Sequence, residues 1–316
     1  MSKFDGLRLT AADLTTFGTG LHRPECVWVD DDGVWVSDER GGVARVTADK
    51  PAELLGSGIS ETNGFTRRED GTFVVAGLGD GALHEIAPDG RTTTLLDKID
   101  GKPLGTVNHA WVDGPRVWVS VMTRASSWTE DLAAATGDGY VILLDNGKAR
   151  IVADGLALTN EVKVSPDGRH LYAAESLGCR IVRFAIAPNG DLGPKELVCD
   201  LGYGGYPDGF SFDGEGNVWV TLVARNGLSV FTPQDGKLHT IYEDVQSAAL
   251  DAFVAGAADG TASGEMLGAC ASPTGPVVLP TSLDFGGPDR RTVYVGSLAT
   301  PYLISFRSPV AGPARG

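Results

Sequence analysis

Short runs of alternating apolar and polar residues occupy most of the chain, and Asp, Gly and Pro follow most of them. The segment "GYPDGFSFDGEGNVWVT" (205–221) shows the pattern: a run from Asp208, the turn "DGEG", and a second run centred on Trp219. Alternation with a period of two, in runs rich in Val, Tyr, Trp and Phe, is typical of half-buried β-strands. Asp-Gly sequences between such runs are typical of tight turns. The pattern predicts an all-β chain of many short strands.

The same unit occurs six times along the chain. Each copy reads as a strand, a turn, a strand centred on an aromatic residue, a second turn and a third strand. We call the first residue of each unit its head residue; it precedes the aromatic residue by 10 to 12 positions in every copy. The head residues are Glu25, Asn63, Asn108, Asn160, Asp208 and Ser282, and the aromatic residues are Trp35, Phe73, Trp118, Tyr172, Trp219 and Tyr294. Repeats of roughly 40–50 residues with three or four antiparallel strands are typical of β-propellers.

We therefore predict a six-bladed β-propeller made by the whole chain, residues 1–316, as a single domain. The segment "LRLTAADLTTFGTGL" ahead of the first unit is expected to supply the outer strand of the last blade, which closes the ring without a free edge. Trp35, Trp118 and Trp219 are expected to be buried on equivalent second strands.

Two insertions interrupt the repeat, at 124–138 and at 242–280. The second is rich in Ala, and its part from Ser247 to about Gly256 is the best helix candidate in the chain. Insertions into a rigid repeat often serve its binding face, but neutral surface loops would look the same. The sequence leaves both interpretations open.

Composition and charge narrow the class of partner. The chain has 316 residues, of which 42% are hydrophobic, and a formal net charge of −15. Such an acidic chain is a poor partner for nucleic acid or anionic membranes, and no apolar run approaches the roughly 20 residues of a membrane helix. The start has no cationic segment followed by an apolar one, so we expect no secretory signal and a cytoplasmic location. Cys26, Cys179, Cys199 and Cys270 lack metal-binding spacing and are expected to be reduced thiols. The oligomeric state stays open.

The head residues carry the candidate chemistry. Equivalent positions in a propeller converge on its axis, and all six head side chains bear oxygen. Asn, Asp and Ser also favour turn-to-strand junctions for local reasons, but Glu25 is not a turn former. Two carboxylates in one channel raise each other's pKa unless a cation lies between them. An all-oxygen set suits a hard divalent ion. We expect Ca²⁺ first, with Mg²⁺, Mn²⁺ and Zn²⁺ as alternatives.

The chain resembles the senescence marker protein/gluconolactonase/luciferin-regenerating-enzyme family. The resemblance rests on "GLHRPECVWVDDDGVWVSDERGGVARV", "LTNEVKVSPDGRHLYAAESLGCRIVRF", "YPDGFSFDGEGNVWVT" and "PTSLDFGGPDRRTVYVGS". It implies a six-bladed propeller that hydrolyses lactones, sugar lactones among them, with a divalent metal. By motif, it implies Glu25, Asn160 and Asp208 as metal ligands, Asp208 also as the catalytic residue, and Asn108 as a substrate contact close to the metal.

The chain departs from the family pattern at three places. Glu161 follows Asn160 where the family often has Gly, and His109 follows Asn108 where it often has Asp. Thr106 stands where a sugar-lactonase pattern has Arg. These departures leave the substrate open.

We expect water to open the ring of a lactone or related cyclic ester, with Asp208 taking the proton. His109 and Glu161 are second candidates at the same mouth, and Arg124 is a candidate contact for a polar substrate group. All three would otherwise be ordinary surface residues. Two other functions stay open: a non-catalytic ligand-binding propeller with a structural cation, and a condensing enzyme like strictosidine synthase. The sequence contains no GxSxG, HExxH or P-loop motif.

Overall fold

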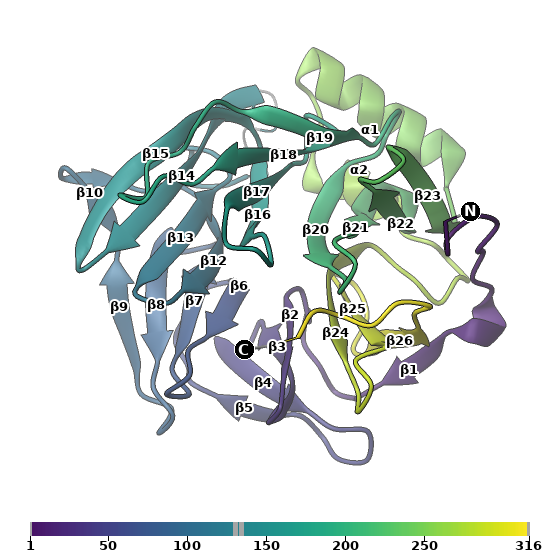
Figure 1. Ribbon diagram of the computed structural model, residues 1–316, viewed down its shortest axis with the longest axis horizontal. Coiled ribbons are helices and arrows are strands. Elements are labelled where there is room, and N and C mark those ends of the chain that lie inside the picture. Colours follow the sequence, from purple (N-terminus) through teal and green to yellow (C-terminus); the bar gives the residue numbers. More distant parts are fainter. Residues whose placement is uncertain (1, 129–131, 133–135, 315–316) are drawn as a thin grey trace.

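Six four-stranded antiparallel sheets surround a central axis as the blades of a propeller (Figure 1). The structure, a computed structural model, describes residues 2–128, 132 and 136–314. The first strands of neighbouring blades contact one another, so these strands form the inner wall of the ring. The predicted six-bladed propeller is confirmed.

In blades 1 to 5 the strands follow the chain from the axis outward, and in blade 6 the outer strand is the N-terminal strand. Blade 1 contains β2 (Val27–Asp30), β3 (Gly33–Asp38), β4 (Gly42–Val46) and β5 (Glu53–Leu55). Blade 2 contains β6 (Thr62–Arg67), β7 (Phe73–Gly77), β8 (Ala82–Ile86) and β9 (Thr92–Leu96). Blade 3 contains β12 (Val107–Asp113), β13 (Arg116–Val121), β14 (Thr136–Asp145) and β15 (Lys148–Ala157). Blade 4 contains β16 (Thr159–Val164), β17 (His170–Glu175), β18 (Arg180–Ala185) and β19 (Glu196–Asp200). Blade 5 contains β20 (Pro207–Phe212), β21 (Val218–Leu222), β22 (Gly227–Thr232) and β23 (Lys237–Tyr242). Blade 6 contains β24 (Pro280–Gly286), β25 (Thr292–Ser297), β26 (Leu303–Arg307) and β1 (Thr15–Phe17). A separate hairpin joins β10 (Lys98–Ile99) and β11 (Lys102–Pro103).

The N-terminal strand closes the ring. β1 pairs antiparallel with β26, with Thr15 opposite Ser305, and so becomes the outer strand of blade 6. Strands from both ends of the chain therefore share one sheet, which confirms the expected closure and covers an edge that would otherwise be open.

The aromatic residues of the second strands fill the spaces between blades. Trp118 and Trp219 are fully buried and Trp35 is 8% exposed, on β13, β21 and β3 respectively. Trp35 meets Phe73 of the next blade at a ring-centroid distance of 4.9 Å, and Trp219 meets Phe285 of the next blade at 5.3 Å. The predicted burial of three tryptophans on equivalent strands is confirmed.

A β-bulge lies at the head position of five blades, where one extra residue interrupts the pairing of the first and second strands. In blade 4, Thr159 pairs with Glu175 and Val162 pairs with Ala173, so two residues of β16 face one residue of β17. A bulge changes the direction in which a strand's side chains point, and bulges are frequent beside active sites.

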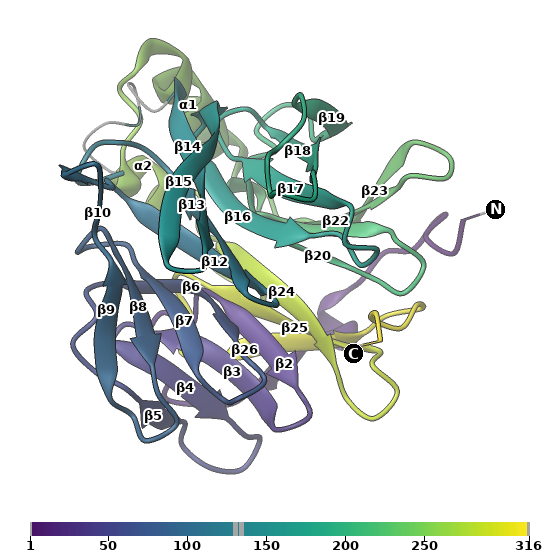
Figure 2. The same cartoon turned by 60° about the vertical axis from the view of Figure 1, so that its left-hand side comes forward.

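The second insertion contains helices α1 (Ser247–Asp259) and α2 (Gly264–Ala269), which confirms the predicted helix. In Figure 2 both helices lie at one end of the blades. Buried Leu250 and Phe253 of α1 and Leu267 of α2 belong to one apolar cluster with residues from the blades. Residues 129–131 and 133–135 of the first insertion lie outside the described residues. No helix in the described part of the chain is both long and apolar enough to cross a membrane.

Candidate active site

Five of the six head residues meet at one cavity on the propeller axis. Glu25, Asn63, Asn108, Asn160 and Asp208 all line it. Among them are all three residues expected to hold a metal ion and the expected substrate contact Asn108. The sixth head residue, Ser282, is buried but is not among the lining residues.

Three oxygens of this cavity are buried and accept no hydrogen bond from any described residue: Glu25 Oε2, Asn108 Oδ1 and Asn160 Oδ1. Hydrogen bonds made by Asn160 and Ser176 explain why Asn160 Oδ1 has no hydrogen-bond donor. Asn160 donates through Nδ2 to Ser176 Oγ at 3.3 Å, and the Ser176 hydroxyl donates to the Pro207 carbonyl at 2.6 Å. Buried acceptors in proteins almost always have a partner. A convergent set of unpartnered oxygens is what a hard cation such as Ca²⁺ binds.

The two carboxylates of the cavity resist ionisation without a cation. Burial, followed by the charge of Asp208, raises the pKa of Glu25 well above its usual value. Burial, followed by the charge of Glu161, raises the pKa of Asp208 to about 7. A bound divalent ion would favour the charged form of both groups. The donor set and its charge therefore fit a divalent metal.

Arg23 is a functional candidate that the sequence reasoning missed. It lines the same cavity, donates from Nη1 to Asn63 Oδ1 at 3.3 Å, and opposes the rise in the pKa of Glu25 and Asp208. Its backbone has a φ of 49°, in a region that non-glycine residues rarely adopt. Arg23 stands just before the repeat unit begins, so the comparison of units did not include it. Its position two residues ahead of Glu25 was the available signal.

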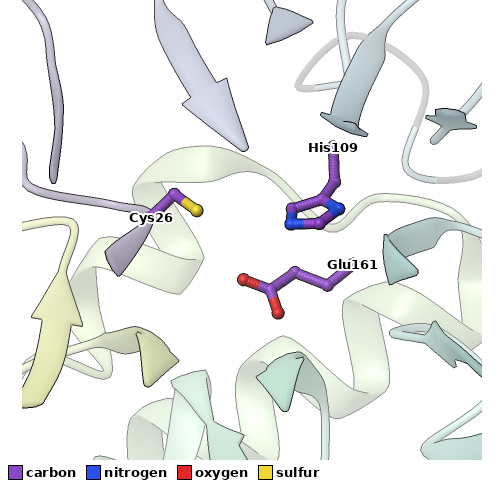
Figure 3. Close-up of side chains that lie close together, drawn as sticks. All are labelled: Cys26, His109 and Glu161. Atoms are coloured by element: carbon purple, nitrogen blue, oxygen red, sulfur yellow. The ribbon is translucent and has the colours of Figure 1, made fainter. Parts of the chain in front are cut away.

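His109 and Glu161 lie together in the interior instead of on the cavity wall. Both are 1% exposed, and neither is among the lining residues. Their side chains point toward Cys26, and one possible ligand atom of each of the three lies within 4.8 Å of the others (Figure 3). Glycines of neighbouring blades make the room, because a Cβ on Gly64 would lie 2.3 Å from the His109 ring and one on Gly209 would lie 2.6 Å from the Glu161 carboxyl carbon.

This interior cluster already contains a cation. Lys163 Nζ lies 3.0 Å from Glu161 Oε2, and the Phe210 backbone N–H donates to the same oxygen at 3.1 Å. Burial alone would raise the pKa of Glu161, but Lys163 and then His109 lower it below its usual value. Burial lowers the pKa of His109 to about 4 and raises that of Cys26 well above its usual value.

The cluster of Cys26, His109 and Glu161 has the donor types that zinc prefers. It is thus a second place where a metal could bind. Both places have buried atoms without a hydrogen-bond partner: His109 Nδ1 and Glu161 Oε1 in the cluster, and Glu25 Oε2, Asn108 Oδ1 and Asn160 Oδ1 in the cavity. Lys163 holds the pKa of Glu161 below its usual value, whereas the pKa of Glu25 and of Asp208 stays raised in spite of Arg23. The cavity is therefore the better metal site of the two.

Arg124 lies away from the cavity. Its side chain is 44% exposed and forms an ion pair with Asp154 at 2.9 Å, and its guanidinium stacks over the Tyr140 ring. It is not among the lining residues. The geometry gives no support to a substrate contact by Arg124.

The sequence did not reveal a repeated set of apolar residues that line the same cavity, which we call the collar. In five blades, a large apolar residue that lines the cavity comes one or two positions after the second strand: Leu78, Met122, Leu177, Val223 and Leu298. Aligning the ends of the second strands, "VAGL", "VSVM", "AAESL", "VTLV" and "VGSL", would have shown this repetition.

Comparisons with known proteins agree with this architecture. A solved gluconolactonase from Xanthomonas campestris superposes with a TM-score of 0.69 at 20% identity, covering 94% of this chain and 89% of that one. The calcium-binding protein regucalcin from Agrobacterium tumefaciens gives a TM-score of 0.67 at 17% identity and covers 94% of both chains. At these identities the likeness shows the fold alone.

Sequence relatives are distant. The 6-deoxy-6-sulfogluconolactonase of Pseudomonas putida is 23% identical over 241 residues, which are 74% of this chain and 67% of that protein. The matches span 54%, 67%, 39% and 42% of the length of the first four curated relatives. The model of the SMP-30/gluconolactonase/LRE-like region matches residues 23–260, well over half of the chain. The chain therefore belongs to the SMP-30/gluconolactonase/LRE-like family.

Proposed function

We propose that this protein is a divalent-metal-dependent hydrolase that opens a lactone or related cyclic ester with water. The observation that carries the proposal is the set of buried, unpartnered oxygens of Glu25, Asn108 and Asn160 in one cavity with Asp208. The names of the lactonases among its relatives and structural neighbours support the reaction class. The calcium-binding neighbour supports Ca²⁺ as the ion.

Glu25, Asn160 and Asp208 are the proposed metal ligands, with Asn108 close enough to contribute to the ion or to the substrate. A bound divalent ion would supply positive charge for the carbonyl oxygen, where negative charge develops as water adds to the carbonyl carbon. Arg23 lines the same cavity and is placed to bind the carboxylate of the product.

Asp208 is the proposed general base. It accepts a proton from the water that attacks the carbonyl carbon, and the bond from that carbon to the ring oxygen then breaks. The same proton passes to the ring oxygen, which leaves as a hydroxyl group, so the product is a hydroxy acid. Removal of a general base typically lowers a rate by about 10²–10⁴-fold.

The test is hydrolysis of a panel of lactones by the chain after a chelator has removed its metal. We expect no hydrolysis by the stripped protein and recovery when Ca²⁺, Mg²⁺, Mn²⁺ or Zn²⁺ is added separately. The same assay separates the other two functions, because a binding propeller with a structural cation or a condensing enzyme would hydrolyse no lactone with any of these ions. Hydrolysis that persists without metal would overturn the proposal.

A matched pair of variants locates the ion. Asn160→Ala removes a ligand of the cavity, and Cys26→Ser removes the thiol of the interior cluster. We expect Asn160→Ala to lower the affinity for Ca²⁺, and Cys26→Ser to leave both affinity and a stoichiometry of one ion per chain unchanged. The reverse result would place the ion at Cys26, His109 and Glu161.

A further inference from the structure

The cavity has a polar floor and an apolar wall. We call Arg23 and the five head residues the floor, and the apolar lining residues Leu78, Met122, Leu177, Val223 and Leu298 are the collar. The collar residues pack in one apolar cluster with helices α1 and α2. A substrate whose carbonyl group reaches the floor must place the rest of its surface against this collar.

The helical insertion completes the wall. Phe253 of α1 and Leu267 of α2 line the cavity and are 4% and 7% exposed. Phe253 is held by an edge-to-face contact with Tyr206, with ring centroids 5.1 Å apart. Gly256 lets the chain after α1 fold back closely, because a Cβ there would lie 3.0 Å from the backbone nitrogen of Ala262. The insertion, which the sequence left open as a binding feature or a neutral loop, thus builds part of the site.

Hydrogen-bonding groups are scarce on this wall. Among the described lining residues outside the floor, the side-chain hydrogen-bond donors are Ser176, whose hydroxyl is committed to Pro207, the Tyr206 hydroxyl and the Trp128 indole N–H. A polyhydroxylated sugar lactone would bury several hydroxyl groups against carbon. Each buried hydroxyl without a partner weakens binding by roughly tenfold.

We infer that the substrates are lactones or related cyclic esters whose ring carries an apolar substituent, an alkyl chain or an aromatic group. The ester group lies on the polar floor, and the substituent lies against the collar and the two helices. This inference rests on the proposed function and names its substrate class.

The test compares glucono-δ-lactone with δ-lactones that carry linear alkyl chains of increasing length. Each buried methylene contributes about 0.8 kcal/mol, which corresponds to about fourfold in kcat/KM. We expect kcat/KM to rise by about that factor per carbon until the chain outgrows the wall, and to be lowest for glucono-δ-lactone.

A matched pair of truncations on helix α1 assigns the effect to the wall. Phe253→Ala removes a lining side chain. Leu250→Ala removes a side chain of the same helix and cluster that is also 4% exposed but does not line the cavity. We expect Phe253→Ala to lower kcat/KM at least tenfold for long-chain lactones and little for the unsubstituted ring. Leu250→Ala should preserve the dependence on chain length. Thermal unfolding and Ca²⁺ binding show whether each variant is folded.

The outcomes separate this inference from the proposed function. Hydrolysis of glucono-δ-lactone in preference to every alkyl lactone would overturn the inference and leave the lactonase intact. If the metal-loaded protein hydrolyses no lactone, the proposed function fails, and calorimetric titration with the longest alkyl lactone then decides. Binding that strengthens with chain length and weakens in Phe253→Ala would support the apolar site, and absence of binding would overturn it.

Discussion

Buried oxygen atoms without a hydrogen-bond donor, and buried carboxylates with a raised pKa, define this site. The amide nitrogen of Asn160 donates to Ser176, and its oxygen has no partner in a cavity that Glu25 and Asp208 also line. The interior cluster differs because Lys163 supplies a positive charge from the chain itself. Lys163 is enough to lower the pKa of Glu161, whereas Arg23 leaves the pKa of Glu25 and Asp208 raised, so these two carboxylates favour a further cation.

Removal of metal should make stability depend on the protonation of Asp208. Its pKa in the folded chain is about 7, above the value of about 4 in an unfolded chain. A raised carboxyl pKa gives stability that is fully present below pH 4 and is lost as the pH rises toward 7. We expect metal-free wild type to lose up to about 4 kcal/mol over this window, at about 1.4 kcal/mol per pKa unit. Asp208→Asn should lack much of this loss. Urea unfolding with chelator at several pH values measures it, and parallel profiles for the two proteins would contradict it.

Loss of Lys163 should leave an uncompensated buried charge. Lys163 and Glu161 are 5% and 1% exposed, and removing one partner of such a pair typically costs about 3–5 kcal/mol. We expect Lys163→Met to lower the free energy of unfolding by that amount at neutral pH, measured by urea denaturation. The double variant Lys163→Met/Glu161→Gln should recover part of the loss. A double variant that is less stable than Lys163→Met alone would show that charge compensation is not the cause.

Among the strands, the β-bulges at the starts of the first strands explain why some site residues could be placed from the sequence and others could not. The repeat spacing was enough to predict that Glu25, Asn108, Asn160 and Asp208 would meet, because equivalent strand starts converge on the axis. It was not enough to place His109 and Glu161. The first strands are buried on both faces, as β16 and β20 are along their whole length, so their sequences hold little alternation that an extra residue could interrupt. His109 and Glu161 were therefore expected at the mouth.

Gly64 and Gly209, which follow Asn63 and Asp208, leave the space that His109 and Glu161 of the neighbouring blades occupy. A Cβ at Gly64 would lie 2.7 Å from His109 Cα, a backbone atom that cannot easily move. We expect Gly64→Ala to destabilise the protein by about 1–3 kcal/mol, as overpacking of a core does. Gly268→Ala in helix α2 is the control, because no atom lies within 4 Å of its would-be Cβ. Thermal unfolding compares the two, and equal stabilities would show that the bulge tolerates a side chain beside His109.

At the scale of the whole molecule, six repeats and one closing strand explain most of the fold. The aromatic spacing recurs in every unit, so the sequence could predict the number of blades and the buried tryptophans. It could also predict that the N-terminal strand would close blade 6. The apolar collar was not predicted, since a residue such as Leu78 just after a strand looks like a continuation of it. Nor could the sequence show that the helical insertion reaches the cavity, because that depends on contacts between residues as distant as Tyr206 and Phe253.

Closure of the ring should make the N-terminal segment part of one cooperative unit, as we propose for the whole chain. Phe4 is 1% exposed and packs edge-on against Trp219 of blade 5, with ring centroids 5.4 Å apart. We expect Phe4→Ala to lower the free energy of unfolding by about 3–5 kcal/mol and to shift a single unfolding transition as a whole. Calorimetry tests this. Two separate transitions, or an unchanged midpoint, would show that the N-terminal segment is independent of the ring.

The central claim is that metal binding and proton transfer meet at Asp208. Asp208→Asn keeps the size of the side chain and one ligating oxygen but removes the negative charge and the proton acceptor. The most direct measurement is the rate of lactone hydrolysis by this variant, at Ca²⁺ concentrations that saturate it, relative to the saturated wild type. We predict a fall of at least about a hundredfold, the lower limit for loss of a general base. A rate within a few-fold of wild type would contradict the claim and leave Asp208 as a ligand alone.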